Sequence, residues 1–228
     1  MHRRLVTGFL ITFLFAIAVP SLAQNTHAQW KDEIAALLAG DADRPPPQNG
    51  VVFVGSSSIH MWTSLATDFP GAPVVNRGFG GSEISDSTFY ADRIVVPLHP
   101  RLIVFYAGDN DIYAGHSPDQ VVTDFKAFVA TVRARLPNTA IAFVTIKPSV
   151  ARWALWPAMH QANDGIAAWA STQKDIRVVD VAAPMLDANG KPRPDLFRAD
   201  GLHMTPAGYA IWIAALRPVL AEYGFHTR

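Results

Sequence analysis

Short, predominantly apolar runs alternate with amphipathic helical patterns along most of this chain, and this alternation restricts the possible folds more than any other feature. The strand candidates are residues 51–54, 73–76, 102–106, 141–146 and 176–181. Runs without polar alternation are typical of strands that are buried on both faces. Strands that alternate with helices predict a parallel sheet covered by helices on both sides, which is an α/β fold.

Two helices carry clear start and stop signals. Ser-Pro-Asp-Gln at 117–120 is a capping box with proline at the first helical position, and Pro137 is expected to end the helix that follows. Thr205 and Pro206 repeat the cap-plus-proline signal. Pro218 is expected to kink or end that second helix.

The N-terminal residues have the pattern of an export signal. His-Arg-Arg at 2–4 is positive, residues 5–19 are almost wholly apolar, and Ser-Leu-Ala at 21–23 is a small-x-small cleavage site. The apolar stretch is short for a membrane span, which needs about 20 residues. We therefore expect cleavage after Ala23 and a periplasmic or secreted protein without a stable membrane span; a retained N-terminal anchor is the alternative.

These patterns predict three regions. Residues 1–23 are the signal peptide, residues 24–49 an N-terminal helix and Pro-rich linker, and residues 50–228 a single α/β domain. Within the second region one apolar helix face precedes the stiff Pro-Pro-Pro segment at 45–47. That face consists of Trp30, Ile34, Leu37 and Leu38.

Composition excludes several classes of function. The 228 residues include no cysteine, and the 19 Lys+Arg balance the 19 Asp+Glu. The balanced charge gives no basic patch for nucleic acid. Without cysteine there is no disulfide, thiol nucleophile or zinc–thiolate site.

Four short polar segments stand where chemistry is expected in such a fold. Gly-Ser-Ser-Ser at 55–58, Asn-Arg-Gly-Phe-Gly-Gly at 76–81 and Gly-Asp-Asn-Asp at 108–111 follow predicted strands, and Asp-Gly-Leu-His at 200–203 precedes the Thr205 cap. The carboxyl ends of parallel strands share one edge of the sheet, where open α/β folds bind ligands. Together the segments offer a hydroxyl, a glycine N–H, a side-chain amide and a carboxylate–imidazole pair. Acyl transfer by a serine needs these groups.

Each segment also has a simpler interpretation. Residues 55–58 could be an N-cap, 76–81 a glycine-rich turn with positive φ, and 200–203 a surface turn. Residues 108–111 could be a polar turn or a metal site, but no nearby histidine or third acid supports a metal, so none is predicted. Walker spacing, the dinucleotide fingerprint and the Gly-x-Ser-x-Gly elbow are all absent.

Taken together, the four segments resemble those of the SGNH hydrolase superfamily, also called GDSL-type esterases, over about residues 51–220. The family usually has Gly-Asp-Ser where this chain has Gly-Ser-Ser, so Ser56 replaces the usual Asp. The spacing to Trp62 places Ser57, rather than Ser58, at the nucleophile position.

The resemblance implies a role for five residues. Ser57, His203 and Asp200 would form the catalytic triad. The backbone N–H groups of Ser57 and Gly81 and the side chain of Asn110 would form the oxyanion hole.

The resemblance also implies a three-layer, flavodoxin-like fold with five parallel strands. The expected function is hydrolysis of carboxylic esters without cofactor or metal, on a small-molecule or glycan ester that carries a short acyl or O-acetyl group. Two alternatives remain open at this point: an O-acetyltransferase acting on a cell-envelope glycan, and a non-catalytic glycan-binding domain. The sequence does not determine the oligomeric state.

The segment at 147–157, after the fourth predicted strand, offers candidates for a substrate pocket. Trp153 and Trp156 could belong to the core or could line the pocket, and Lys147 or Arg152 could meet a polar acyl or sugar group. Phe79 and Tyr106 are further candidates to line the site.

Overall fold

The computed structural model describes residues 26–227. The predicted signal peptide and its cleavage site lie outside the described residues. No helix in the described part of the chain is long and apolar enough to cross a membrane.

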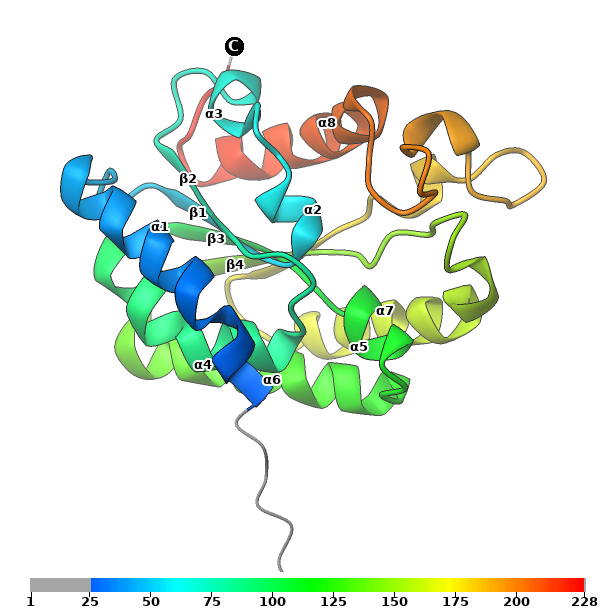
Figure 1. Ribbon diagram of the computed structural model, residues 1–228, viewed down its shortest axis with the longest axis horizontal. Coiled ribbons are helices and arrows are strands. Elements are labelled where there is room, and N and C mark those ends of the chain that lie inside the picture. The colour runs from blue at the N-terminus through cyan, green and yellow to red at the C-terminus, as the bar shows by residue number, and fades with distance from the viewer. Residues whose placement is uncertain (1–25, 228) are drawn as a thin grey trace, which may run out of the picture.

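Five parallel strands form the sheet, in the order β2-β1-β3-β4-β5 (Figure 1). They are β1 (Val51–Gly55), β2 (Val74–Gly78), β3 (Leu102–Tyr106), β4 (Ala140–Val144) and β5 (Ile176–Val179). The predicted α/β fold with a five-stranded parallel sheet is therefore confirmed. Every residue of β1, β3 and β4 is buried, which explains their uninterrupted apolar sequences.

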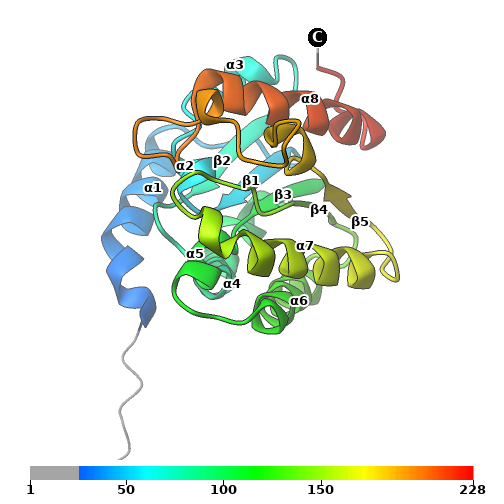
Figure 2. The ribbon, with the colours of Figure 1, turned by 90° about the vertical axis from the view of Figure 1, so that its right-hand side faces the viewer.

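Helices cover both faces of the sheet (Figures 1 and 2). One face carries α1 (Lys31–Asp43), α4 (Ile84–Ile94), α6 (Pro118–Arg135) and α7 (Trp156–Ala170), and the other carries α2 (Ser57–His60), α3 (Leu65–Asp68) and α8 (Pro206–Glu222). The short α5 (Asp109–Tyr113) follows β3. Five 3₁₀ turns complete the described structure: Thr26–Trp30, Val96–Leu98, Trp153–Leu155, Ala183–Met185 and Pro194–Leu196.

The helix signals act largely as predicted. The Ser117 hydroxyl accepts the Gln120 N–H at 3.1 Å, and α6 ends at Arg135, before Pro137. The Gln120 side chain does not complete the capping box, because it donates to Asp124 at 2.8 Å instead.

Of the two expectations for Pro218, that it kinks or that it ends the last helix, the second is wrong. Thr205 caps α8 as predicted, but the helix continues through Pro218 to Glu222. Leu216 and Leu220, on either side of the proline, are fully buried against the sheet. Their packing offsets the roughly 3 kcal/mol that a proline costs inside a helix.

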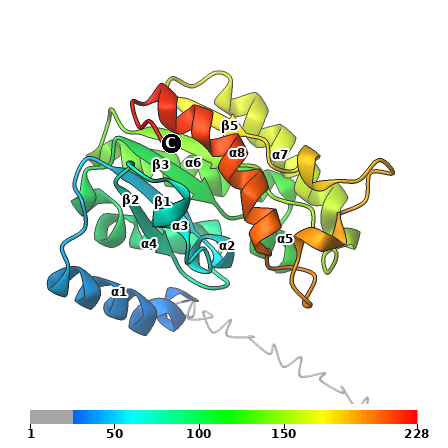
Figure 3. The ribbon, with the colours of Figure 1, turned by 90° about the horizontal axis from the view of Figure 1, so that it is seen from above.

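The N-terminal helix α1 lies on the outside of the domain (Figure 3), and a few side chains anchor it there. Ile34 is fully buried, and the ring of Trp30 contacts that of Phe79 edge-on at 5.7 Å. The Arg77 guanidinium pairs with Asp41 at 2.6 Å, which joins β2 to α1. Trp30, Ile34 and Asp41 thus anchor the N-terminal helical segment on the domain.

Candidate active site

Ser57 is the first residue of α2, immediately after β1. The chain leaves the strand through Gly55, whose φ is +136° and where a Cβ atom would lie 1.8 Å from the Tyr106 carbonyl oxygen. Only glycine fits this contact. The resulting sharp turn holds Ser57 at the carboxyl edge of the sheet, partly exposed to solvent.

A continuous hydrogen-bonded chain joins Ser57 to His203 and Asp200. His203 Nε2 lies 3.1 Å from Ser57 Oγ, and His203 Nδ1 lies 2.7 Å from Asp200 Oδ2. The other carboxylate oxygen of Asp200 accepts the backbone N–H groups of Leu202 and His203 at 2.8 and 2.9 Å. The structure therefore brings together the three residues predicted for the triad.

Two features of the 200–203 turn hold this arrangement. Gly201 has a φ of +67°, and its carbonyl accepts the Ala151 N–H at 3.0 Å, which ties the turn to the loop after β4. The hydrogen bond with His203, together with the backbone N–H groups of the turn, lowers the pKa of Asp200 to about 2. Asp200 is thus an anion at neutral pH and holds Nδ1 of His203 as the protonated nitrogen.

Asn110 is joined by a hydrogen bond to the segment that contains Gly81. Asn110 Nδ2 donates to the carbonyl of Ser82, the residue that follows Gly81, at 2.9 Å. One amide hydrogen of Asn110 is used in this bond, and the second remains for a ligand. In the described part of the chain, neither the Gly81 N–H nor the Ser57 N–H donates to a protein acceptor.

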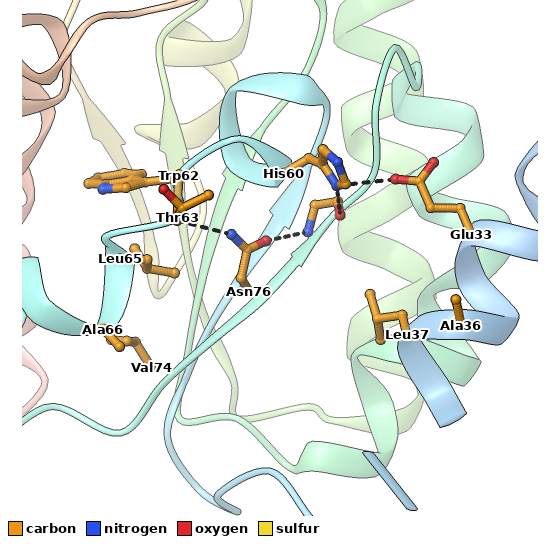
Figure 4. A pocket seen from close by; sticks show the side chains of 11 residues that line it. Glu33, Ala36, Leu37, His60, Trp62, Thr63, Leu65, Ala66, Val74 and Asn76 are labelled. Atoms are coloured by element: carbon orange, nitrogen blue, oxygen red, sulfur yellow. Dashed lines mark hydrogen bonds and ion pairs between the residues drawn. The ribbon is translucent and has the colours of Figure 1, made fainter. Parts of the chain in front are cut away.

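Asn76 joins the end of β2 to the helix of Ser57, a role that the sequence reasoning missed. Its amide nitrogen donates to the Ile59 carbonyl at 2.7 Å. Its amide oxygen accepts the Gly78 N–H at 2.9 Å (Figure 4). A Cβ atom on Gly78 would lie 2.2 Å from the His60 nitrogen, so β2 approaches α2 too closely for any other residue. The signal for this contact is the Asn-x-Gly spacing.

A buried ion cluster lies next to Asn110. Lys147 Nζ is 3.3 Å from Asp109 Oδ2 and 3.0 Å from the Tyr106 hydroxyl, and an Arg152 nitrogen is 3.4 Å from the same Asp109 oxygen. Burial alone would raise the pKa of Asp109, but the two cations outweigh it and lower that pKa. Asp109 is therefore charged and fixed in place.

The residues predicted for the substrate pocket do not line one common cavity: Tyr106, Lys147 and Arg152 gather around Asp109, and the other three lie elsewhere. Phe79, Tyr106 and Lys147 are buried and offer no exposed surface to a substrate, and Arg152 is turned toward Asp109. The Trp153 and Trp156 rings are partly exposed and stack with centroids 6.2 Å apart. Trp156 lines a cavity of about 270 Å³ beside β5, and Ser57 is not among the residues of its wall.

A larger cavity of about 570 Å³ lies between α1 and the edge strand β2 (Figure 4). Its wall includes Leu37, His60 and Val74, but neither Ser57 nor His203. Glu33 also reaches its wall, and this carboxylate accepts the Gly80 N–H at 3.1 Å and lies 3.1 Å from His60 Nδ1. The N-terminal helix thus contacts both the glycine turn before Gly81 and the helix of Ser57.

The position where the family usually has Asp is closed to solvent. The Ser56 hydroxyl is buried without a hydrogen-bond partner, while its backbone N–H donates to the Tyr106 carbonyl at 3.0 Å. The Ser58 hydroxyl is buried without a partner as well. Of the three serines, only Ser57 faces His203.

The premise that no histidine or third acid accompanies the 108–111 segment is wrong. Glu83, Asp111 and His116 bring their ligand atoms within 4.8 Å of one another, and they are the one group in residues 26–227 with the makeup of a metal site. Burial, reinforced by the nearby Glu83 and Asp109 charges, raises the pKa of Asp111 to about 7. The sequence signal was the presence of His116 five residues after Asp111.

Comparison with known proteins assigns the chain to a family. Residues 53–211 match the GDSL-like Lipase/Acylhydrolase family, so the chain belongs to that family and is a carboxylic ester hydrolase. The resemblance to GDSL-type esterases is thereby confirmed. Among curated proteins, none matches the sequence significantly.

Solved structures share the fold at low sequence identity. A Streptococcus pneumonia protein proposed to be a platelet activating factor has a TM-score of 0.75 at 20% identity, with 87% of this chain and 96% of that chain covered. A GDSL-like lipase from Bacteroides thetaiotaomicron has a TM-score of 0.68 at 23% identity, covering 86% and 97%. A catalytic mutant of an acetylxylan esterase from Geobacillus stearothermophilus has a TM-score of 0.62 at 17% identity, covering 80% and 98%.

Proposed function

We propose that the chain hydrolyses esters through a Ser57–His203–Asp200 triad. The observation that carries this proposal is the unbroken set of contacts from Ser57 Oγ to His203 Nε2 at 3.1 Å and from His203 Nδ1 to Asp200 Oδ2 at 2.7 Å. A serine hydroxyl is a weak nucleophile, and an adjacent oriented imidazole is the usual means of activating it.

In the first step, His203 Nε2 takes the proton of Ser57 Oγ as the oxygen attacks the ester carbonyl. The charge on the carbonyl oxygen is stabilised by the Ser57 and Gly81 N–H groups and by the free amide hydrogen of Asn110. Asp200, which is ionised at neutral pH, stabilises the imidazolium. His203 then gives its proton to the departing alcohol, and an acyl group remains on Ser57.

In the second step, His203 takes a proton from water, and the resulting hydroxide attacks the acyl carbonyl. Collapse of the tetrahedral species releases the carboxylic acid and returns the proton to Ser57. Every proton transfer uses the same Nε2 atom.

We propose short acyl or O-acetyl esters of carbohydrates as the substrate class. Asp200 and His203 are 47% and 25% exposed, so the groups stand near solvent where a bulky polar alcohol portion can be accommodated. The acetylxylan esterase of Geobacillus stearothermophilus shows that the same fold serves a protein of that description.

The test is the turnover of p-nitrophenyl acetate by purified protein and by three serine variants. Ser57→Ala should lose turnover by at least ~10³-fold, while Ser56→Ala and Ser58→Ala keep most of it, because their hydroxyls face no base. Retained activity in Ser57→Ala would contradict the proposal. A parallel series with acetylated xylan and with free sugar acceptors separates hydrolysis from acetyl transfer.

A further inference from the structure

Three ligand-type side chains meet directly behind the proposed oxyanion donors. Glu83 stands at the start of α4, just after Ser82, and Asp111 lies in α5 next to Asn110. His116 follows α5. Three segments therefore contribute one ligand atom each to a space in which all these atoms lie within 4.8 Å of one another.

Asp111 is oriented toward this space and is incompletely bonded. Its Oδ1 atom accepts the Ile84 N–H at 3.0 Å, which fixes the carboxylate plane. Its Oδ2 atom is buried without a hydrogen-bond partner, and the residue as a whole is 0% exposed. A buried carboxylate oxygen without a partner is costly, so such an atom calls for a ligand.

His116 completes the set with a ring that has carboxylates on both sides. Its Nε2 atom is 3.6 Å from Glu83 Oε2, too long for a good hydrogen bond but suited to two ligands of one cation. Its Nδ1 atom is buried without a partner, 3.9 Å from Asp124 Oδ2. Histidines that bind metals usually donate their other ring N–H to a carboxylate, and Asp124 would have to move closer to Nδ1 to accept this hydrogen bond.

The charge of the site also points to a cation. Three carboxylates, those of Glu83, Asp111 and Asp124, surround one imidazole, and no Lys or Arg within residues 26–227 forms an ion pair with any of them. Lys147 and Arg152, the two cations of the buried ion cluster, are directed at Asp109.

We propose that Glu83 Oε2, Asp111 Oδ2 and His116 Nε2 bind a divalent transition-metal ion of the Zn²⁺ or Mn²⁺ type, with Asp124 orienting the imidazole. Mixed oxygen and imidazole ligands suit these ions, whereas Mg²⁺ and Ca²⁺ prefer oxygen ligands alone. Three protein ligands leave a further position for water.

The ion would have a positioning role and would not touch the substrate. It would link Glu83 to Asp111. Their chain neighbours Ser82 and Asn110 are already joined by a hydrogen bond. Both Gly81 and Asn110 would be held more rigidly.

The experiment uses untagged protein that has been treated with EDTA and dialysed. Zn²⁺ and Mn²⁺ are titrated by calorimetry, and the melting temperature is measured with and without each ion. We expect one equivalent bound and a higher melting temperature, with Mg²⁺ and Ca²⁺ much weaker. Because the readout is binding and stability, the result is independent of whether Ser57 is the nucleophile.

The variants separate this site from others. His116→Gln should abolish the binding, and Glu83→Gln, which removes a direct ligand, should weaken it by more than the roughly 10–100-fold that is typical for loss of an outer-shell partner. The matched control is His160→Gln, which removes an exposed histidine that also pairs with a carboxylate, Asp164, at 2.9 Å but lacks a third ligand. Asp111→Asn is avoided as the primary test because the residue is buried.

The proposal is overturned if the wild-type protein binds neither ion, or if His116→Gln and Glu83→Gln both keep the wild-type stoichiometry and melting shift. Loss of binding in His160→Gln but not in His116→Gln would show an adventitious surface site and would equally overturn it. Circular dichroism of each variant confirms that it is folded.

Discussion

Replacing Lys147 by methionine removes one of the two cations that hold the buried carboxylate Asp109. The Lys147 and Asp109 side chains are only 1% and 5% exposed, and Nζ lies 3.3 Å from Oδ2. Methionine has a similar length and fills the same volume, so the change removes charge and hydrogen bonding rather than packing. Tyr106 would also lose its partner at 3.0 Å.

Breaking a buried ion pair by removing one partner typically costs about 3–5 kcal/mol. Arg152 remains 3.4 Å from the same oxygen, which favours the lower end of that range, ~3 kcal/mol. For a domain of roughly 200 residues this corresponds to a melting temperature lower by about 6–12 °C. The control is Lys174→Met, at a side chain that is 92% exposed, where a change within about 0.5 kcal/mol is expected.

The pH dependence gives the prediction a second check. The pKa of Asp109 is lowered in the folded protein, so its stabilising contribution is present above the unfolded pKa and is lost as pH falls through the folded one. Without Lys147 the folded pKa of Asp109 rises, and the folded variant takes up a proton at higher pH. The stability deficit should therefore be larger at about pH 7 than at about pH 5.

Urea unfolding at both pH values, followed by circular dichroism, measures the deficit directly. A loss no greater than that of Lys174→Met, or a deficit that does not change with pH, would refute the view that Asp109 is a charged partner of Lys147.

Asn110→Ala should lower kcat by ~10²–10³-fold with little change in KM, because it removes an oxyanion donor; an unchanged kcat would exclude that role. Asp200→Asn should lower turnover by up to ~10⁴-fold. Because the pKa of Asp200 is about 2, its stabilising contribution is complete above the ordinary carboxyl value of ~3.9 and is lost as pH falls toward 2, so the unfolding free energies of wild type and variant should converge only in that acidic range. Glu33→Ala frees the Gly80 N–H and His60, and should lower kcat about fivefold to tenfold, the equivalent of one hydrogen bond of ~1 kcal/mol. Glu33→Gln keeps an acceptor for Gly80 and should retain most of the activity; equal losses in the two variants would indicate that the charge matters rather than the bond.

The centre of the sheet could be predicted because burial on both faces gives β1, β3 and β4 uninterrupted apolar sequences. The residues at which the strands end could not be predicted, because they depend on side-chain partners that are distant in the sequence. β2 extends through Arg77, beyond the predicted end at 76, because Asp41 neutralises the buried guanidinium. β4 ends at Val144, before the predicted 146, because the Ile146 N–H donates to Asn163 at 2.7 Å.

For the candidate site as well, some features could be predicted from the sequence and others could not. Ser57 and His203 are 146 residues apart, and only the order of the four motifs suggested that they meet. The ion pair of Lys147 with Asp109 could not be predicted. A lysine after a strand can point outward to a substrate or inward to an acid, and Asp109 lies 38 residues away in the sequence. The Glu83–Asp111–His116 cluster was missed because Glu83 approaches from another strand end.

Covalent labelling tests the central claim most directly. An alkyl fluorophosphonate reacts with a serine that is activated by a neighbouring base, and fragmentation of the labelled peptide distinguishes Ser57 from Ser56 and Ser58. We expect one phosphonyl group per chain, on Ser57, with loss of esterase activity in proportion to labelling and little labelling of His203→Ala. A label on Ser58 or outside residues 55–58, or full ester turnover by protein labelled at Ser57, would contradict the assignment of Ser57 as the nucleophile.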